Sequence, residues 1–206
     1  MSVAIIDYGS GNLRSAAKAF ERAISETGLN LKVQVTNNPD DLARASHIVL
    51  PGVGAFGDCR HGLDDLSGMT DAMEKEVIQG GKPFLGICVG MQLLASYGWE
   101  HGKHKGLGWI PGEVVPITPS DPTLKIPHMG WNNLTFLKDH PVIKDISDGA
   151  HTYFVHSYQF SCKDSKHLLS TVDYGEQVTA MIARDNMVGT QFHPEKSQSV
   201  GLKLIA

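Results

Sequence analysis

A cysteine and a histidine, about a hundred residues apart, each stand in a setting suited to hydrolytic chemistry. Cys88 is the middle residue of Gly-Ile-Cys-Val-Gly at positions 86–90, between an apolar stretch expected as a strand and a stretch over 89–97 expected as a helix. A nucleophile between two such glycines is typical of a sharp strand-to-helix turn. The start of a helix favours a thiolate. We therefore predict Cys88 as a nucleophile, with the Val89 amide donating to a developing oxyanion.

The alternative for Cys88 is a buried structural cysteine, because free cysteines are common in protein cores. The motif at positions 86–90 does not by itself decide between the two. Cys59 and Cys162 lack flanking glycines, and both are predicted to be structural.

His193 is followed by Pro194 and Glu195. A residue before proline tends to be extended, and residues two apart on an extended chain share a face. Glu195 is therefore expected to accept the imidazole N–H of His193, which is the role of the third member of a catalytic triad. The alternative is an exposed turn with an incidental acid. Together with the cysteine motif, the pair predicts a Cys88-His193-Glu195 triad.

The segment 52–57 has the pattern Gly-x-Gly-x-x-Gly, which also occurs in dinucleotide-binding loops. Pro51 before it is unusual for such loops, and the acids about 20 residues further on fall within an expected helix rather than at a strand end. We favour a loop beside the nucleophile, in which the Val53 amide is an oxyanion donor and Gly54 lets a substrate approach closely. We predict no cofactor and no metal site.

The elements that position these residues follow an α/β pattern. Up to about residue 100, strands and helices alternate, which predicts a doubly wound α/β sheet with flanking helices. The second half shows short strands joined by turns, and these predict antiparallel or mixed additions to the central sheet. The chain is predicted to be a single domain over residues 1–206. The expected helices are 13–27, 39–45, 89–97 and one beginning at 197; the expected strands are 3–6, 31–35, 47–50, 83–87, 113–117, 151–158, 168–172, 178–183 and 187–192.

Composition narrows the class of protein. The formal net charge of -4 over 206 residues gives no reason to expect a nucleic acid or a membrane surface as partner. No apolar run approaches the roughly 20 residues that cross a bilayer. Three cysteines are too few for a disulfide framework, which favours the reducing cytoplasm.

With these residues assembled, the chain resembles the class I glutamine amidotransferases. Within that class it is most similar to the family of glutaminase subunits of imidazole glycerol phosphate synthase, an enzyme of histidine biosynthesis. The cysteine motif and the His-Pro-Glu segment mark the class, and other segments mark the family. The matching segments are 6–15, 50–58, 83–92, 127–132, 153–158 and 190–197.

The resemblance implies that Cys88 attacks the side-chain amide of glutamine, while His193 acts as acid and then as base. It implies that Gly54, Gln92, Ser157 and Tyr158 hold the substrate glutamine. The released ammonia would pass to a (β/α)₈ cyclase subunit in a heterodimer. There it would react with a phosphoribulosyl-formimino-carboxamide nucleotide to give imidazole glycerol phosphate and an aminoimidazole carboxamide ribotide.

The resemblance further implies that four residues lie near the partner interface: Asn12, Trp131, Tyr153 and Lys196. Simpler interpretations stay open, because Trp131 and Tyr153 could be core aromatics and Lys196 a solvated charge. Two other functions also stay open. One is a glutaminase that supplies a different synthase, and the other is a nucleotide-binding or scaffolding module without turnover.

Overall fold

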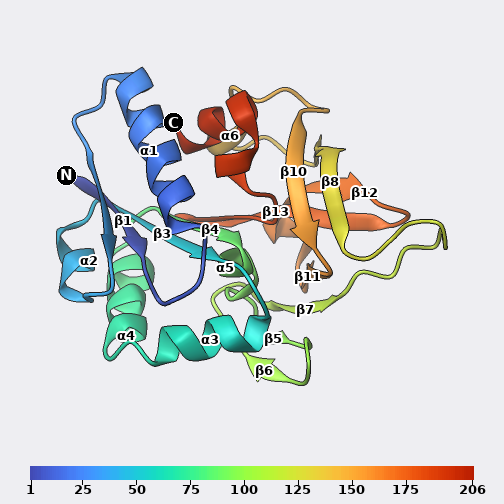
Figure 1. Cartoon of the computed structure of the whole chain (residues 1–206), viewed down its shortest axis with the longest axis horizontal. Helices are drawn as coiled ribbons and strands as arrows, with labels where there is room; N and C mark the ends of the chain where they lie inside the picture. Colours follow the sequence, from blue (N-terminus) through green and yellow to red (C-terminus); the bar gives the residue numbers. More distant parts are fainter.

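The computed structural model describes all residues from Met1 to Ala206, and its centre is an eight-stranded mixed sheet (Figure 1). Five neighbouring strands of this sheet are parallel, in the order β2-β1-β3-β4-β14. Three antiparallel strands, β13, β12 and β9, extend it beyond β14. The bounds are β1 Ser2–Ile6, β2 Lys32–Thr36, β3 His47–Gly52, β4 Phe84–Cys88, β9 Thr135–Phe136, β12 Leu168–Asp173, β13 Gln177–Arg184 and β14 Met187–Thr190.

Helices cover both faces of the parallel strands (Figure 1). On one face α1 (Leu13–Thr27) packs beside α6 (Gln198–Ile205), and on the other α3 (Phe56–Asp64) leads into α4 (Met69–Met73). The π-helical turn Glu74–Gln79 continues α4, and the short α2 (Asp40–Arg44) joins β2 to β3. As its sequence predicts, α1 ends at Gly28, whose left-handed φ of 70° suits a glycine. The predicted doubly wound α/β sheet is confirmed.

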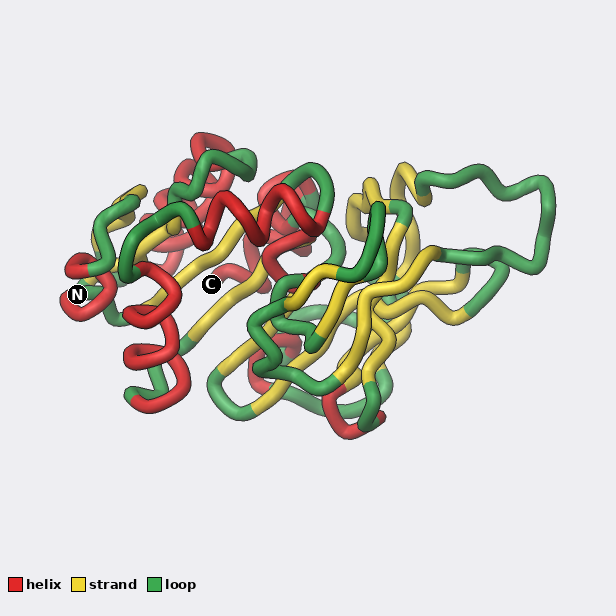
Figure 2. Tube along the Cα trace, turned by 90° about the horizontal axis from the view of Figure 1, so that it is seen from below, coloured by secondary structure: helices red, strands yellow, loops and turns green.

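Two smaller sheets pack beside the central sheet, one against β13 and α3 and the other against β12, and the end of the molecule opposite the N-terminus consists mostly of strands and loops (Figure 2). One has the order β11-β7-β5-β6, and the other pairs β10 with β8. The loop between β7 and β8 projects from this end (Figure 1). The bounds are β5 Tyr97–Gly98, β6 His104–Lys105, β7 Gly112–Pro116, β8 His128–Asn133, β10 His151–His156 and β11 Tyr158–Cys162.

The predicted additions to the central sheet are therefore only partly right. β12 and β13 join that sheet as expected, but β7, β10 and β11 belong to the two smaller sheets. The difference comes from strand pairing, because β10 pairs along its whole length with β8 and not with the central sheet. The sequence did not predict β8, since this strand carries no alternation of apolar and polar residues. The single stretch expected over 151–158 is also two strands, which separate at Ser157.

The expected helix over 89–97 is much shorter than predicted. α5 covers only Val89–Gln92, and by Tyr97 the chain is already in β5. The carbonyls of Leu93, Leu94 and Ala95 accept amides from the segment 107–110, so they are not available to continue the helix. A long-range contact thus replaces the helical pattern that the sequence favours locally.

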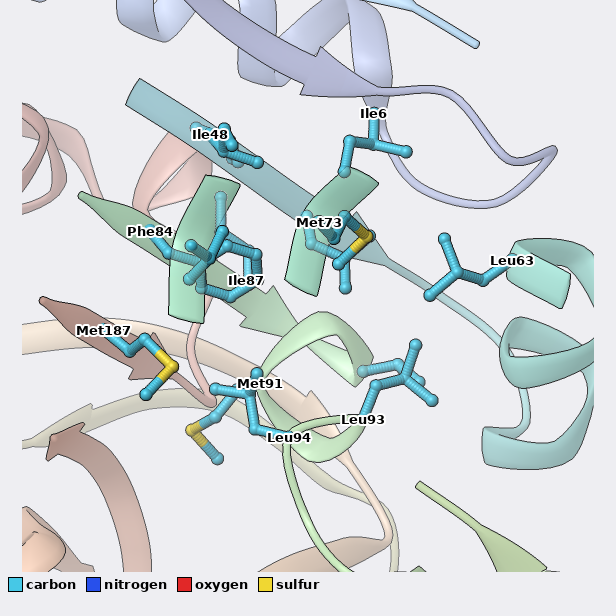
Figure 3. Close-up of a cluster of buried hydrophobic side chains, with 14 of the residues drawn as sticks. Ile6, Ile48, Leu63, Met73, Phe84, Ile87, Met91, Leu93, Leu94 and Met187 are labelled. Carbon is cyan, nitrogen blue, oxygen red and sulfur yellow. The ribbon is translucent and has the colours of Figure 1, made fainter. Parts of the chain in front are cut away.

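Buried side chains form two clusters. The larger one lies around the parallel strands, where Phe84 and Ile87 of β4 pack with Ile48, Met91 and Met187 (Figure 3). The smaller one lies under the antiparallel strands and includes Phe154, Leu169, Met181 and Phe192, all fully buried. No helix combines the length and apolarity that a bilayer crossing requires.

Candidate active site

Three neighbouring parallel strands end at the same level. In the register of the sheet, Gly52 at the end of β3 lies opposite Cys88 at the end of β4, and Thr190 at the end of β14 lies opposite Ile87. The segment that follows Thr190 therefore runs past Cys88. Binding sites of parallel sheets lie beyond the carboxyl ends of the strands, and the cysteine, the glycine loop and the histidine all reach that edge.

The predicted strand-to-helix turn at Cys88 is confirmed. Cys88 has φ 55° and ψ -112°, a left-handed conformation that is strained for a side chain other than glycine. The flanking glycines are needed for space: a Cβ at Gly90 would lie 1.8 Å from the Leu50 carbonyl oxygen, and one at Gly86 would lie 2.7 Å from the Gly90 carbonyl oxygen. The turn thus brings the cysteine close against β3.

His193 and Glu195 are paired as predicted, since Nδ1 of the imidazole lies 2.8 Å from Oε1 of the carboxylate, and both side chains are only 3% exposed. His193 itself is extended, at φ -93° and ψ 100°. Glu195, however, lies in a 3₁₀ turn, Pro194–Lys196, and not in the extended chain that the sequence argument assumed. The turn, which Pro194 starts, brings Glu195 back to the imidazole.

The surroundings of His193 favour its protonated form. Burial lowers the pKa of His193, but the nearby Cys88 thiol and the hydrogen bond and charge of Glu195 raise it to about 9. Because the carboxylate binds Nδ1, Nε2 is the ring nitrogen left available to the nearby thiol. This is the arrangement in which an imidazole can take a proton from sulfur.

The backbone of His193 is tied to β10. Its amide donates to the Tyr153 carbonyl at 3.0 Å. The buried hydroxyl of Ser197 donates to the His193 carbonyl at 2.7 Å and accepts the Tyr153 amide at 3.0 Å. The histidine is therefore held from two sides before any ligand binds.

Cys88 and His193 line a cavity of about 290 Å³. All four residues that the resemblance assigns to substrate binding line the same cavity. The wall is formed by Val53, Gly54, Cys88, Val89, Gln92, Glu100, Pro127, Val155, His156, Ser157, Tyr158 and His193. The glycine loop is thus part of the cysteine site, as the favoured interpretation of positions 52–57 expects.

Gln92 is held firmly in the cavity wall. Its side-chain nitrogen donates to the Tyr158 carbonyl at 3.1 Å and to Oε1 of Gln191 at 3.0 Å. The side-chain nitrogen of Gln191 in turn lies 3.7 Å from the Cys88 sulfur. Gln191, which was not predicted, thus links the proposed substrate-binding wall to the nucleophile.

The two predicted oxyanion donors differ. Val89 is the first residue of α5, so its amide has no acceptor within the helix. The Val53 amide, in contrast, donates to the Ser10 hydroxyl at 3.0 Å, and the same hydroxyl donates to the Val53 carbonyl at 2.6 Å. In this conformation the Val53 amide is not offered to the cavity, because it donates to Ser10.

Glu100 is a site residue that the sequence analysis missed. It lies in the turn between β5 and β6, where its Oε2 accepts the Phe56 amide at 2.8 Å, and it is the one carboxylate in the cavity wall. Nothing in the segment 99–103 marks its one acidic residue as part of a site. Only the folding of the turn over α3 brings it to the cavity.

Three of the predicted interface residues form a surface cluster, which we call the Trp131 cluster: Trp131, Tyr153 and Lys196. Trp131 and Tyr153 are paired across β8 and β10 with ring centroids 5.9 Å apart, and the Lys196 ammonium lies 5.9 Å from the Tyr153 ring. Trp131 is 47% exposed, so the alternative of a core aromatic is wrong for it. Asn12 is exposed and caps the start of α1 without a side-chain hydrogen bond.

The family model described as glutamine amidotransferase class-I matches residues 4–205, and the chain belongs to this family. Two relatives are each described as imidazole glycerol phosphate synthase subunit HisH. That of Rhodospirillum rubrum and that of Agrobacterium fabrum are both 56% identical to this chain, over all of it and 97% of their own length. The resemblance noted in the sequence is thereby confirmed.

Solved structures show the same fold. A structure described as glutamine amidotransferase matches with a TM-score of 0.71 at 16% identity, over 98% of both chains. A glutamine amidotransferase from Thermotoga maritima matches with a TM-score of 0.67 at 18% identity, over 95% of this chain and 76% of that one. At such low identities these two matches show the fold alone.

Proposed function

We propose that this chain hydrolyses glutamine to glutamate and ammonia, as the glutaminase subunit of an imidazole glycerol phosphate synthase in histidine biosynthesis. The observation that carries this is the meeting of Cys88 with the His193–Glu195 pair at one cavity, in a chain 56% identical to HisH subunits over its whole length. A scaffolding module would need neither the strained cysteine nor the buried ion pair.

In the proposed reaction, the proton of the Cys88 thiol passes to His193, whose charged form the site favours, and the Cys88 sulfur attacks the side-chain carbonyl carbon of glutamine. The C–N bond then breaks, and His193 returns the proton to the leaving ammonia. Water next adds to the glutamyl thioester with His193 as base, which releases glutamate and restores the thiol. Glu195 keeps the imidazole in one tautomer and stabilises its charged form.

Each wall of the cavity has a proposed role in binding. The Val89 amide donates to the oxyanion, and the Val53 amide joins it once it turns away from Ser10. Gly54, Gln92, Ser157 and Tyr158 hold the substrate side chain and backbone. Glu100, as the one carboxylate of the wall, matches the ammonium group of a free amino acid. The site therefore suits free glutamine.

We propose that the partner, bound in a heterodimer, is a (β/α)₈ cyclase. The relatives' names describe subunits of one synthase, which supports a partner for this chain. The partner would receive the ammonia and convert the formimino-carboxamide nucleotide into imidazole glycerol phosphate and the aminoimidazole carboxamide ribotide. The Trp131 cluster and Asn12 are the proposed contact surface. We further propose that the chain folds as a single domain and works in the cytoplasm.

The test is Cys88→Ala in the complex with the cyclase. We expect glutamine-dependent turnover to be lost, because no other group can form the thioester, while free ammonium still drives the cyclase. Turnover is measured as product formed from glutamine or from ammonium. Cys162→Ala, at a half-buried cysteine away from the cavity, is the matched control. Glutamine hydrolysis that survives Cys88→Ala would rule out this nucleophile, and loss of both activities in an intact complex would rule out ammonia transfer.

A further inference from the structure

Two buried histidines beside the cavity have no part in the proposed chemistry. His128 on β8 and His156 at the end of β10 face each other in the register of their sheet and are 2% and 6% exposed. Nδ1 of His128 lies 3.0 Å from Nε2 of His156. The His128 ring stacks on Phe154 and packs against Tyr174, with centroids 4.8 Å and 4.1 Å away. The rings are therefore held in fixed orientations.

The hydrogen-bond partners of the two rings show which nitrogen of each ring carries the hydrogen. The Tyr158 carbonyl, 2.8 Å from Nδ1 of His156, can only accept, so this nitrogen carries the hydrogen. Nε2 of His156 then accepts from Nδ1 of His128. Nε2 of His128 is left to accept the Asn132 side-chain amide at 3.3 Å. Both rings are thus neutral and protonated at Nδ1, and all their hydrogen bonds run in one direction.

Burial supports this assignment. It lowers the pKa of His128 to about 4. It is also the largest influence on His156, whose pKa falls to about 3 although the Tyr158 carbonyl opposes the shift. Neutral rings at pH 7 are the state in which each can both donate and accept a hydrogen bond.

The histidine pair is connected to the cavity wall through the Tyr158 carbonyl. This carbonyl accepts one hydrogen bond from Nδ1 of His156 at 2.8 Å and another from the Gln92 side-chain nitrogen at 3.1 Å. Since Gln191 accepts the other Gln92 hydrogen, both hydrogens of that carboxamide are used. The Gln92 side-chain oxygen is then the atom left to accept a hydrogen bond from a ligand.

From these contacts we infer that His128 and His156 are positioning residues for the glutamine site. They hold the Tyr158 carbonyl, and through it they orient Gln92 so that its side-chain oxygen meets the substrate. This inference rests on the proposed glutaminase function. It adds two residues that lie outside the triad and act on binding rather than on the chemical step.

The test compares His156→Leu with His156→Asn in the complex with the cyclase. Leucine removes both ring nitrogens, whereas the asparagine amide keeps a donor near the place of Nδ1. Loss of one anchoring hydrogen bond is expected to raise KM for glutamine about five- to tenfold with a smaller change in kcat, and asparagine is expected to restore most of it. His167→Leu, at a buried histidine outside the cavity wall, is the matched control.

Alkylation of Cys88 by iodoacetamide separates this inference from the function itself. The thiol is expected to remain reactive in His156→Leu as in wild type, because the triad is untouched. An unchanged KM in His156→Leu, or equal impairment in the leucine and asparagine variants, would overturn the positioning role. A wild-type complex that fails to hydrolyse glutamine would instead overturn the proposed function.

A measurement on the wild-type chain covers the case in which His156→Leu does not fold. In a ¹⁵N-histidine spectrum at pH 7, two imidazoles are expected to be neutral with the hydrogen on Nδ1, and to be identified by the conservative variant His128→Asn. A charged ring, or a hydrogen on Nε2 of His156, would overturn the inference, because His156 could then not both hold Tyr158 and accept from His128.

Discussion

At the scale of single residues, the Ser10 hydroxyl decides whether the oxyanion site is complete. It accepts the amide of Val53 and donates to the carbonyl of the same residue, so both polar groups of Val53 are engaged away from the cavity. The Cys59 thiol reinforces this at 3.3 Å from the same carbonyl. Val53 is nevertheless 42% exposed, which leaves room for its peptide to turn. The isolated chain is therefore expected to hydrolyse glutamine slowly.

Ser10→Ala is expected to speed up this slow hydrolysis. Without the hydroxyl, the Val53 amide loses its acceptor and can turn towards the cavity. Removing one oxyanion donor lowers kcat by about 10²–10³. We expect a smaller gain, of about tenfold in kcat, because the Val53 amide in the variant is free to turn but is not held in the cavity. The measurement is glutamate release by the isolated chain. Ser15→Ala, at an exposed serine of α1, is the control, and equal rates in both variants would contradict the role of Ser10.

At the scale of elements, the reactive turn depends on how closely α5 approaches β3. The backbone of α5 passes so near β3 that a Cβ at Gly90 would overlap the Leu50 carbonyl. A short helix of four residues, Val89–Gln92, contributes little stability by itself. Its position is thus set by packing against the ends of β3 and β4.

Gly90→Ala is expected to destabilise the whole chain, because α5 must move away from β3 to make room for the methyl group. A clash with backbone cannot be relieved by a rotamer change, and we expect a loss of at least about 3 kcal/mol in the free energy of unfolding. Urea unfolding measures it. Gly28→Ala is the matched control: Gly28 has φ 70° in open space, so only the backbone strain of about 1 kcal/mol is expected there. Equal losses at both glycines would contradict the argument from close packing.

At the scale of the whole molecule, the two small sheets give the chain a face that the central sheet does not provide. β8 and β10 expose the Trp131 cluster, and the backbone of β10 also holds His193 through Tyr153. A partner bound at this face would thus touch the strand that supports the proposed catalytic base. This arrangement fits a protein whose proposed activity depends on a partner.

Trp131→Ala is expected to weaken the complex with the cyclase. Large exposed aromatics at the centre of an interface contribute at least about 2 kcal/mol, so Kd is expected to rise about thirtyfold or more. Titration calorimetry of the two proteins measures it. Trp99→Ala is the matched control, since Trp99 is 42% exposed but lies just after β5 on the other small sheet. A similar rise for both variants would show that the Trp131 cluster is not the contact surface.

The sequence by itself determined the parallel half of the fold, the turn at Cys88 and the pairing of His193 with Glu195. These follow from short-range patterns: apolar runs that fill strands, glycines that leave room for a tight turn, and the nearness of Glu195 to His193 along the chain. The sequence argument placed Glu195 by an extended backbone, whereas a 3₁₀ turn brings it to the imidazole. Such patterns need no knowledge of distant parts of the chain.

Other features depended on the tertiary structure alone. Three of them depend on contacts between residues that are far apart in the sequence. These are the hydrogen bonds of Val53 with Ser10, the position of Glu100 in the cavity wall and the early end of α5. The same holds for the pairing of His128 with His156, which follows from the antiparallel register of β8 and β10. Such hydrogen bonds form between polar groups that come together only when the sheets pack, so they cannot be predicted from the local sequence.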